Sequence, residues 1–200
     1  MIILLETHTM FASSEIFWDR VNYVKIDIQE AQGHSGGIWV MQRRGSGFNF
    51  TLVSKMQQCI SFIVNKGSDK WLCSAVYASP VATMRPFLWE FLDYISKTVS
   101  LPWLAIGDFN DILLPREQKG GVFSNSKADL FASNVDKCGL IDLGSFGTKF
   151  TWQGKCRGGR IVHRRLDRGL GNYDWRMKFP EATVEHLVRR HSDHNPIYYK

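Results

Sequence analysis

The feature that most constrains the fold is a series of short runs rich in β-branched and aromatic residues. Five of them lie between residues 23 and 79 and read YVKIDI, GGIWVMQ, FNFTLVS, CISFIVN and WLCSAVYAS. Gly, Asn, Lys and Ser separate the runs, as is typical of strands joined by turns. The pattern predicts a meandering sheet.

Helical patterns are fewer and lie between groups of strands. Segment 84–99 places five apolar residues on one helical face, namely Phe87, Leu88, Phe91, Leu92 and Ile95. Further helices are predicted at 13–22, capped by Ser13 or Ser14, at 125–139, ending at Gly139, and at 173–179. A doubly wound fold would follow each strand with a helix, so this order favours an α+β fold in which sheet packs on sheet and helices lie outside.

The remaining strands are predicted at both ends of the chain. Four are expected at 2–6, 102–107, 183–188 and 195–199. Two more, 149–154 and 164–170, are predicted to pair across a basic loop. The 200 residues show no repeat, low-complexity tract or linker, so a single domain over 1–200 is expected.

The net charge of +6 is concentrated in the last quarter of the chain. Residues 151–200 carry 11 Lys and Arg against 5 Asp and Glu. A basic segment of this kind is either a solvated hairpin or a surface for a polyphosphate partner such as DNA. The candidate DNA contacts lie in the stretch KCRGGRIVHRRLDR and are Lys155, Arg157, Arg160, Arg164, Arg165 and Arg168.

Other function classes are disfavoured by composition. The longest apolar runs, such as MIILL, are too short to span a bilayer, and no secretory signal is visible, so no membrane partner is expected. The four cysteines are scattered without a CxxC pair. They are expected to be reduced thiols inside a cell, and a zinc site built from them is not expected.

Polar residues follow several of the predicted strands. They are found in LLET, AVYASP, IGDFN, RRLDRGL and SDHNPI, and the candidates are Glu6, Tyr77, Asp108, Asn110, Asp167, Asp193 and His194. Each has a purely structural explanation: Asp108 and Asn110 could form an Asx turn, and Tyr77 could be a core aromatic. Asp108 and Asn110 stand two apart, however, so they could project together from the carboxyl end of a strand, where sheet proteins commonly hold ligands.

Together these residue types match the needs of phosphodiester hydrolysis. Carboxylates such as Glu6 and Asp193 are hard oxygen ligands suited to Mg²⁺ or Mn²⁺. A histidine beside a carboxylate can act as a base or a phosphate partner, and a second Asp can fix its tautomer. Asn and Tyr can donate hydrogen bonds to phosphate oxygens. Whether these side chains converge is not visible in the residues alone.

The motifs LLET, VYASP, IGDFND, RLDR and SDHNPI, in this order, resemble the endonuclease/exonuclease/phosphatase superfamily. The intervening text, including SGGIWV, PREQKGG and CGLIDLGSFGTKFTW, is similar to the endonuclease domain of plant LINE-type (non-LTR) retrotransposons. The resemblance covers essentially the whole chain. It implies a DNase I-like, four-layer fold: a two-sheet β-sandwich flanked by helices.

The resemblance also implies residue roles. Glu6 matches the metal-binding Glu, and Tyr77 matches the phosphate-facing Tyr. Asp108 matches the Asp that handles the attacking water or a phosphate oxygen, with Asn110 as its partner. In the SDH motif, Asp193 is expected to bind metal and His194 to contact the scissile phosphate or serve as base. Asp167 matches the Asp that orients this histidine.

The implied function is Mg²⁺- or Mn²⁺-dependent nicking of DNA, with an intracellular, nuclear location. In an intact element a reverse transcriptase is expected downstream, and these residues do not include it. Family members begin with a strand that carries an Asn in a motif like WNxRG, whereas Met1 here falls almost on the LxET strand. The domain is therefore expected to lack its first strand and to be inactive or weakly active.

Two further alternatives stay open at this point. The chain could be a catalytically silent remnant that binds nucleic acid, or another phosphoesterase of the superfamily, of the inositol-phosphate or sphingomyelin type. Relatives that cut at abasic sites carry Asn three residues after the Tyr, where this chain has Pro80, so activity at abasic sites is not expected.

Overall fold

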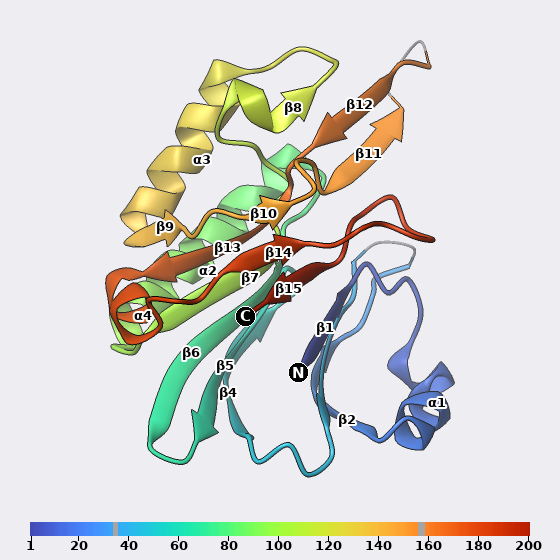
Figure 1. The fold of residues 1–200 in the computed structure, drawn as a ribbon, viewed down its shortest axis with the longest axis vertical. Helices are drawn as coiled ribbons and strands as arrows, with labels where there is room; N and C mark the ends of the chain where they lie inside the picture. Colours follow the sequence, from blue (N-terminus) through green and yellow to red (C-terminus); the bar gives the residue numbers. More distant parts are fainter. Residues whose placement is uncertain (34–35, 156–158) are drawn as a thin grey trace.

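The strands build two layers of β-sheet that face each other. The computed structural model describes residues 1–33, 36–155 and 159–200. The first layer is a six-stranded sheet in the order β4-β5-β6-β7-β13-β9 (Figure 1). Its strands, in this order, are Asn49–Met56, Cys59–Lys66, Asp69–Tyr77, Trp103–Asp108, Asp167–Asn172 and Leu140–Asp142.

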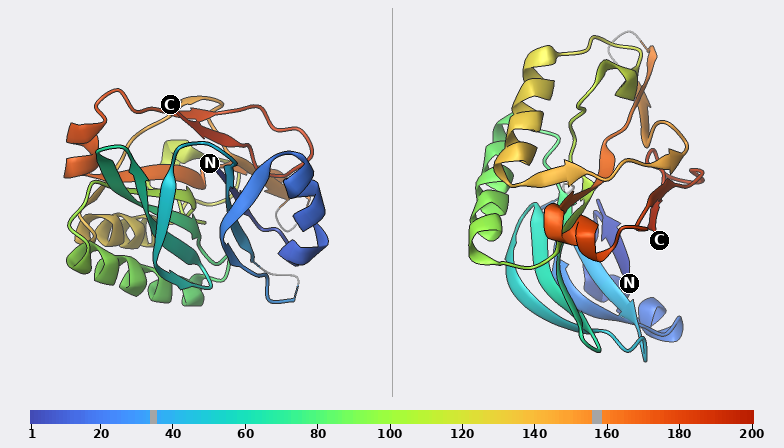
Figure 2. Two further views of the ribbon diagram at one scale, coloured as in Figure 1. Left: turned by 90° about the horizontal axis from the view of Figure 1, so that it is seen from below. Right: turned by 60° about the vertical axis from the view of Figure 1, so that its left-hand side comes forward.

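The second layer consists of two three-stranded sheets. The N-terminal one has the order β1-β3-β2, with strands Ile2–Leu5, Ile38–Arg43 and Tyr23–Gln29. The C-terminal one has the order β10-β14-β15, with strands Phe146–Gly147, Val184–His186 and Ile197–Tyr199. Figure 2 shows the first and last strands of the chain close together in both views.

A third small sheet extends from the sandwich. Strands β11 (Trp152–Lys155) and β12 (Ile161–Arg164) form an antiparallel hairpin, and β8 (Gln118–Lys119) pairs with β12. In Figure 1 this hairpin projects from the upper edge of the molecule.

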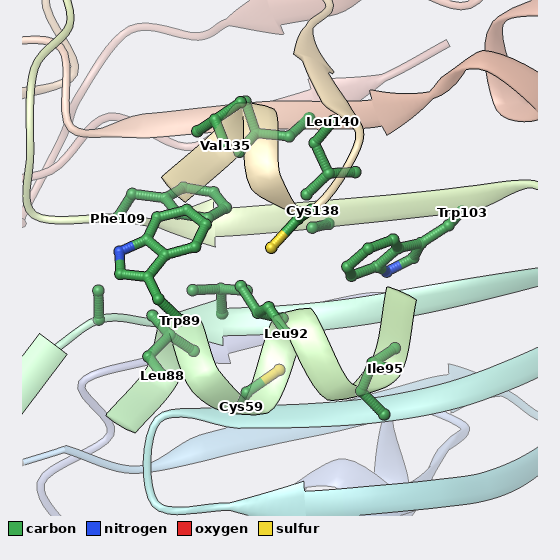
Figure 3. Packing of buried hydrophobic residues seen from close by; sticks show 14 of the residues in the cluster. Cys59, Leu88, Trp89, Leu92, Ile95, Trp103, Phe109, Val135, Cys138 and Leu140 are labelled. Atoms are coloured by element: carbon green, nitrogen blue, oxygen red, sulfur yellow. The ribbon is translucent and has the colours of Figure 1, made fainter. Parts of the chain in front are cut away.

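Helices cover the outer faces of the layers. Helices α2 (Arg85–Thr98) and α3 (Asn125–Lys137) pack on the six-stranded sheet, where Trp89, Leu92 and Val135 meet the sheet side chains in the largest buried cluster (Figure 3). Helix α1 (Glu15–Arg20) lies on the outer face of the N-terminal sheet, where its Trp18 packs against Trp39 and Met41. The other helical segments are short and complete the connections: α4 Tyr173–Lys178, and the 3₁₀ turns Phe11–Ser13, Ala82–Met84 and Pro115–Glu117.

Three buried clusters correspond to the three interfaces between these layers. One lies between helices and the six-stranded sheet. A second joins Ile38 and Val40 of β3 to Phe62 and Ala75 of the six-stranded sheet. The third packs Phe11 on Trp39 and Met41 beneath α1. The expected two-sheet sandwich flanked by helices is therefore confirmed.

Several local predictions need correction. The five runs from 23 to 79 do not form one meander, because β2 and β3 belong to the second layer and β4, β5 and β6 to the first. Segment 164–170 is not one strand: β12 ends at Arg164 and β13 begins at Asp167 in a different sheet. On α2, Phe87 is 54% exposed and Trp89 is buried in its place.

Ends of helices follow the predicted signals in part. Gly139 adopts φ +64° just past Cys138, the C-cap of α3, as expected for a helix stop. Ser14 occupies the N-cap position of α1 but makes no capping hydrogen bond with its side chain. In the part of the chain that the structure describes, no helix combines the length and the apolar character needed to cross a membrane.

Candidate active site

Polar side chains lie at the same end of three neighbouring strands in the middle of the six-stranded sheet. Tyr77 closes β6, Asp108 closes β7 and Asp167 opens the antiparallel strand β13. The register pairs Asp108 with Tyr77 on one side and with Asp167 on the other. Since alternate residues share a face, Asp108 lies on the same side as Ile106, which packs between the two layers. The three polar groups therefore face the second layer.

The turn after β7 fixes the Asp108 carboxylate. Gly107 has φ +141°, and a Cβ there would lie 2.0 Å from the carbonyl oxygen of Val76, so only glycine fits before Asp108. Asn110 has φ +51° and donates from its backbone N–H to Oδ1 of Asp108 (2.8 Å) and from Nδ2 to Oδ2 (2.9 Å). Its Nδ2 also donates to the carbonyl of Ala78 (2.7 Å). The Asp-x-Asn pair is thus a positioned carboxylate.

The second layer supplies Glu6 and His194. Glu6 follows β1 with φ +53°, and its Oε1 accepts a hydrogen bond of 2.5 Å from the Tyr77 hydroxyl. His194 Nδ1 lies 2.9 Å from Oδ2 of Asp167, and His194 Nε2 lies 4.0 Å from Oδ2 of Asp108. Because the ionised Asp167 can only accept, Nδ1 carries the proton, and Nε2 is directed toward Asp108.

These side chains form a cluster that fits a divalent cation. Glu6, Asp108 and His194 each offer one ligand atom, and the three atoms lie within 4.8 Å of one another. The Asp167 carboxylate, also buried, faces the same histidine. Carboxylate oxygens are the ligands that Mg²⁺ and Mn²⁺ prefer, and three carboxylates around one histidine leave an excess of negative charge. The donor set therefore fits the ion that the resemblance implies.

The electrostatics of the cluster follow from burial and crowding. Burial, followed by the charge of Asp167, raises the pKa of Asp108 well above its ordinary value. Burial works against the charged form of His194, but the hydrogen bond and charge of Asp167 outweigh it and raise the pKa to about 9. Burial and the hydrogen bond to Glu6 raise the pKa of Tyr77, so its hydroxyl stays neutral and acts as a donor.

Asp193, predicted as the second metal ligand, is placed differently. Its side chain is exposed, and its Oδ2 accepts a 3.0 Å hydrogen bond from the indole Nε1 of Trp152. Among the described residues, the carboxylates close enough to share a metal ion with His194 are Glu6 and Asp108, whereas the sequence predicted Glu6 and Asp193. The negative charge of Asp193 still contributes to the raised pKa of Tyr77.

The prediction that Arg165 and Arg168 contact DNA is wrong, because both are buried in ion pairs. Arg168 is fully buried and donates to Glu117 Oε2 and Asp142 Oδ2, each at 2.7 Å. Arg165 donates to Glu117 Oε1 at 2.9 Å and to Asp142 Oδ2 at 2.8 Å. The charge run thus includes two cations that belong to the interior.

The other predicted DNA contacts lie on or near the hairpin. Lys155 and Arg160 are exposed, and Arg164 lies over the ring of Trp152 at 5.8 Å while its Nε donates to Gln118. Arg157 lies outside the described residues. The surface of the hairpin therefore keeps a positive character without Arg165 and Arg168.

Three residues near the site were missed as functional candidates: Glu117, Asp142 and Trp152. Glu117 and Asp142 bind the two arginines that flank Asp167, and Trp152 binds Asp193. The available signal was the RRLDR motif itself. Arginines that flank a residue at the start of a buried strand are buried too, and a buried arginine needs acidic partners. The partners come from segments 23 to 51 residues earlier, so the local sequence does not identify them.

Comparison with solved structures identifies the fold. The endonuclease domain of TRAS1, a telomere-specific non-LTR retrotransposon, superposes with a TM-score of 0.66 at 14% identity and covers 100% of this chain and 97% of its own. TDP2 of D. rerio, complexed with a single-strand DNA product, gives 0.60 at 14% identity over 98% of this chain and 84% of its own. An endonuclease/exonuclease/phosphatase family protein from Leptotrichia buccalis C-1013-b gives 0.60 at 13% over 100% and 84%.

These likenesses show the fold alone, because all the identities are low. The chain has the DNase I-like fold of endonuclease/exonuclease/phosphatase domains. No family model matches the sequence, and no curated protein matches it either.

Proposed function

We propose that this chain is a metal-dependent phosphodiesterase that nicks DNA. The observation that carries the proposal is the single cluster at the edge of the sandwich. It combines the Asp167–His194 hydrogen bond, the buried Asp108 carboxylate 4.0 Å from Nε2 of His194, and Glu6 bound to Tyr77. A positioned base, a fixed histidine and neutral donors are the groups that attack of water on phosphorus requires.

Each residue has a distinct task in this proposal. Glu6 would hold the Mg²⁺ or Mn²⁺ ion with Asp108 in reach, and the ion, when bound, neutralises negative charge that develops on the phosphate. Asp108 accepts the proton of the attacking water, for which a raised pKa suits it. His194, held by Asp167, donates from Nε2 to a phosphate oxygen, and Tyr77 donates a second hydrogen bond. The water oxygen bonds to phosphorus as the bond from phosphorus to the leaving oxygen breaks, and the leaving oxygen takes a proton from solvent water.

DNA as the substrate rests on the surface around the site. Lys155 and Arg160 are exposed on the hairpin, and Arg164 lies at its base. The TRAS1 endonuclease and TDP2, the latter complexed with a single-strand DNA product, share this fold, which supports a nucleic-acid substrate and a retrotransposon origin. A nuclear location follows from that origin, and a reverse transcriptase would act with the domain in an intact element.

A supercoiled-plasmid assay tests the proposal. Conversion to nicked circles is expected with Mg²⁺ or Mn²⁺ and not with EDTA. His194→Ala and Asp108→Asn should each slow nicking by roughly 10²- to 10⁴-fold, because the first removes a hydrogen-bond donor to the phosphate and the second removes the proton acceptor for the attacking water. His191→Ala is the matched control: His191 is an exposed histidine three residues away and should leave the rate unchanged.

Two outcomes would contradict the proposal. Nicking that persists in EDTA or in His194→Ala would point to a contaminating nuclease or another site. Binding of plasmid without any nicking in Mg²⁺ or Mn²⁺ would identify the chain as a silent nucleic-acid-binding domain.

A further inference from the structure

A surface pocket adjoins the candidate active site. It has a volume of about 300 Å³ and is formed by residues of β11, β12 and the segments before β11 and before β15. Two of its wall residues are connected directly to the site. Asn195 follows His194 in the chain, and Trp152 is paired with His194 by an isolated antiparallel bridge. The pocket therefore adjoins the segment that carries His194, and a DNA strand bound at His194 could reach it.

The chemistry of the pocket suits an anion joined to a flat ring. Among the described residues that line it none is acidic, whereas Lys149 and Arg189 are cationic. The rings of Phe150 and His163 lie 5.7 Å apart with their planes 37° from parallel, and Nζ of Lys149 is 5.5 Å from the Phe150 ring centre. Aromatic side chains bearing a nearby cation are the usual platform for an unpaired nucleobase.

The side chains of the pocket are held in place by their neighbours. Arg189 donates to Oε1 of Gln153 at 2.9 Å, which fixes the guanidinium at the wall. Nδ2 of Asn195 donates to Oγ1 of Thr148 at 2.6 Å and to the carbonyl of Phe150 at 3.2 Å. A pocket of similar volume near α1 differs in kind, because its lining includes the acidic residues Glu15, Asp27 and Glu30. Positive charge and aromatic rings therefore coincide at the pocket beside His194.

We infer that this pocket binds one unstacked nucleotide of the DNA strand next to the scissile phosphate. The base stacks on Phe150, and the adjoining phosphate pairs with Lys149 and Arg189. The inference rests on the proposed function, since it takes the strand at His194 to be DNA. If the pocket takes up an unstacked base, the enzyme should cut preferentially at positions where a base can leave the duplex.

Fluorescence of a short single-stranded oligonucleotide carrying 2-aminopurine tests the inference, with EDTA present so that cleavage does not interfere. Wild-type protein should quench the 2-aminopurine, because stacking quenches this base. Phe150→Leu should weaken binding by roughly 5- to 150-fold, the range for losing one base–aromatic stack. Arg189→Gln, at a surface position, should weaken binding and reduce its dependence on salt.

The matched control is Phe146→Leu. Phe146 also has a lysine over its ring, Lys200 at 5.6 Å, but it does not line the pocket. The Phe146→Leu variant should bind the oligonucleotide as tightly as wild type does. An oligonucleotide with an abasic position in place of 2-aminopurine should bind wild type and Phe150→Leu equally, because the stacking partner of the ring has been removed.

The outcomes separate this inference from the proposed function. If quenching and affinity are unchanged in both Phe150→Leu and Arg189→Gln, the pocket does not bind the nucleotide, whatever the plasmid assay shows. If the protein does not nick plasmid but still quenches 2-aminopurine in a way that depends on Phe150, the proposed nuclease activity is wrong and the assignment of the pocket as a nucleotide site is supported. The nucleotide dAMP is the second probe: binding as tight as that of the oligonucleotide would assign the pocket to a free nucleotide and overturn its role in holding a strand.

Discussion

At the scale of single residues, the site depends on one hydrogen bond between distant parts of the chain. Asp167 and His194 are 27 residues apart and meet at 2.9 Å. The sequence could suggest this pair only through its resemblance to a family, because nothing local links a strand residue to a histidine in a later loop. The placement of Asp193 shows the limit: the SDH motif groups it with His194, yet its carboxylate turns to Trp152.

Asp167→Asn should lower the pKa of His194 in the metal-free protein from about 9, because the hydrogen bond and the charge of Asp167 are the largest contributions that oppose burial, while the charges of Asp108 and Glu6 remain. The folded-state pKa is raised, so protonated His194 stabilises the fold fully below about pH 6.5, and this contribution is lost as the pH rises through about 9. NMR titration of the imidazole signals of wild type and the variant measures the change. An unaltered His194 titration would mean that Asp167 does not set its charge.

At the scale of elements, much of the strand pattern could be predicted and the partners could not. The predicted strand 59–65 is observed as Cys59–Lys66, since alternation and turn residues mark strand ends locally. Whether β3 joins β2 or β4 is decided by packing between layers, which such runs do not encode. In the same way, burial of Arg168 is decided by Glu117 and Asp142, which lie far away in the sequence.

The ion cluster that holds the start of β13 should be a large contributor to stability. Arg168→Met leaves Glu117 and Asp142 with one buried cation fewer, and breaking a buried pair in this way costs about 3–5 kcal/mol of unfolding free energy. Lys97→Met is the matched control, because Lys97 pairs with Asp93 at the surface and its loss should change stability little. Urea denaturation measures both. Equal small effects would show that the cluster does not hold β13 in place.

At the scale of the whole molecule, the site exists because the two sheet layers meet there. The six-stranded sheet presents Tyr77, Asp108 and Asp167, whereas Glu6 and His194 come from segments of the second layer. Close approach of the layers is marked by Gly169, where an added Cβ would collide with the hydroxyl of Tyr199 on β15. Residues from both layers can bind one ion only if the layers stay together, so ion binding and folding should be coupled.

Mg²⁺ or Mn²⁺ should therefore raise the melting temperature of the EDTA-treated protein. At 100 times Kd an ion that binds only the folded state adds about 2.7 kcal/mol, which corresponds to roughly 5–10 °C at about 2–4 °C per kcal/mol for a chain of this size. Glu6→Gln should abolish most of the shift, because it removes a carboxylate of the cluster. Asp193→Asn should retain it, since Asp193 is bound to Trp152 instead. A scanning fluorimetry titration of the three proteins tests both assignments: a shift lost in Asp193→Asn would restore Asp193 as a metal ligand, and a shift kept in Glu6→Gln would remove Glu6 from the site.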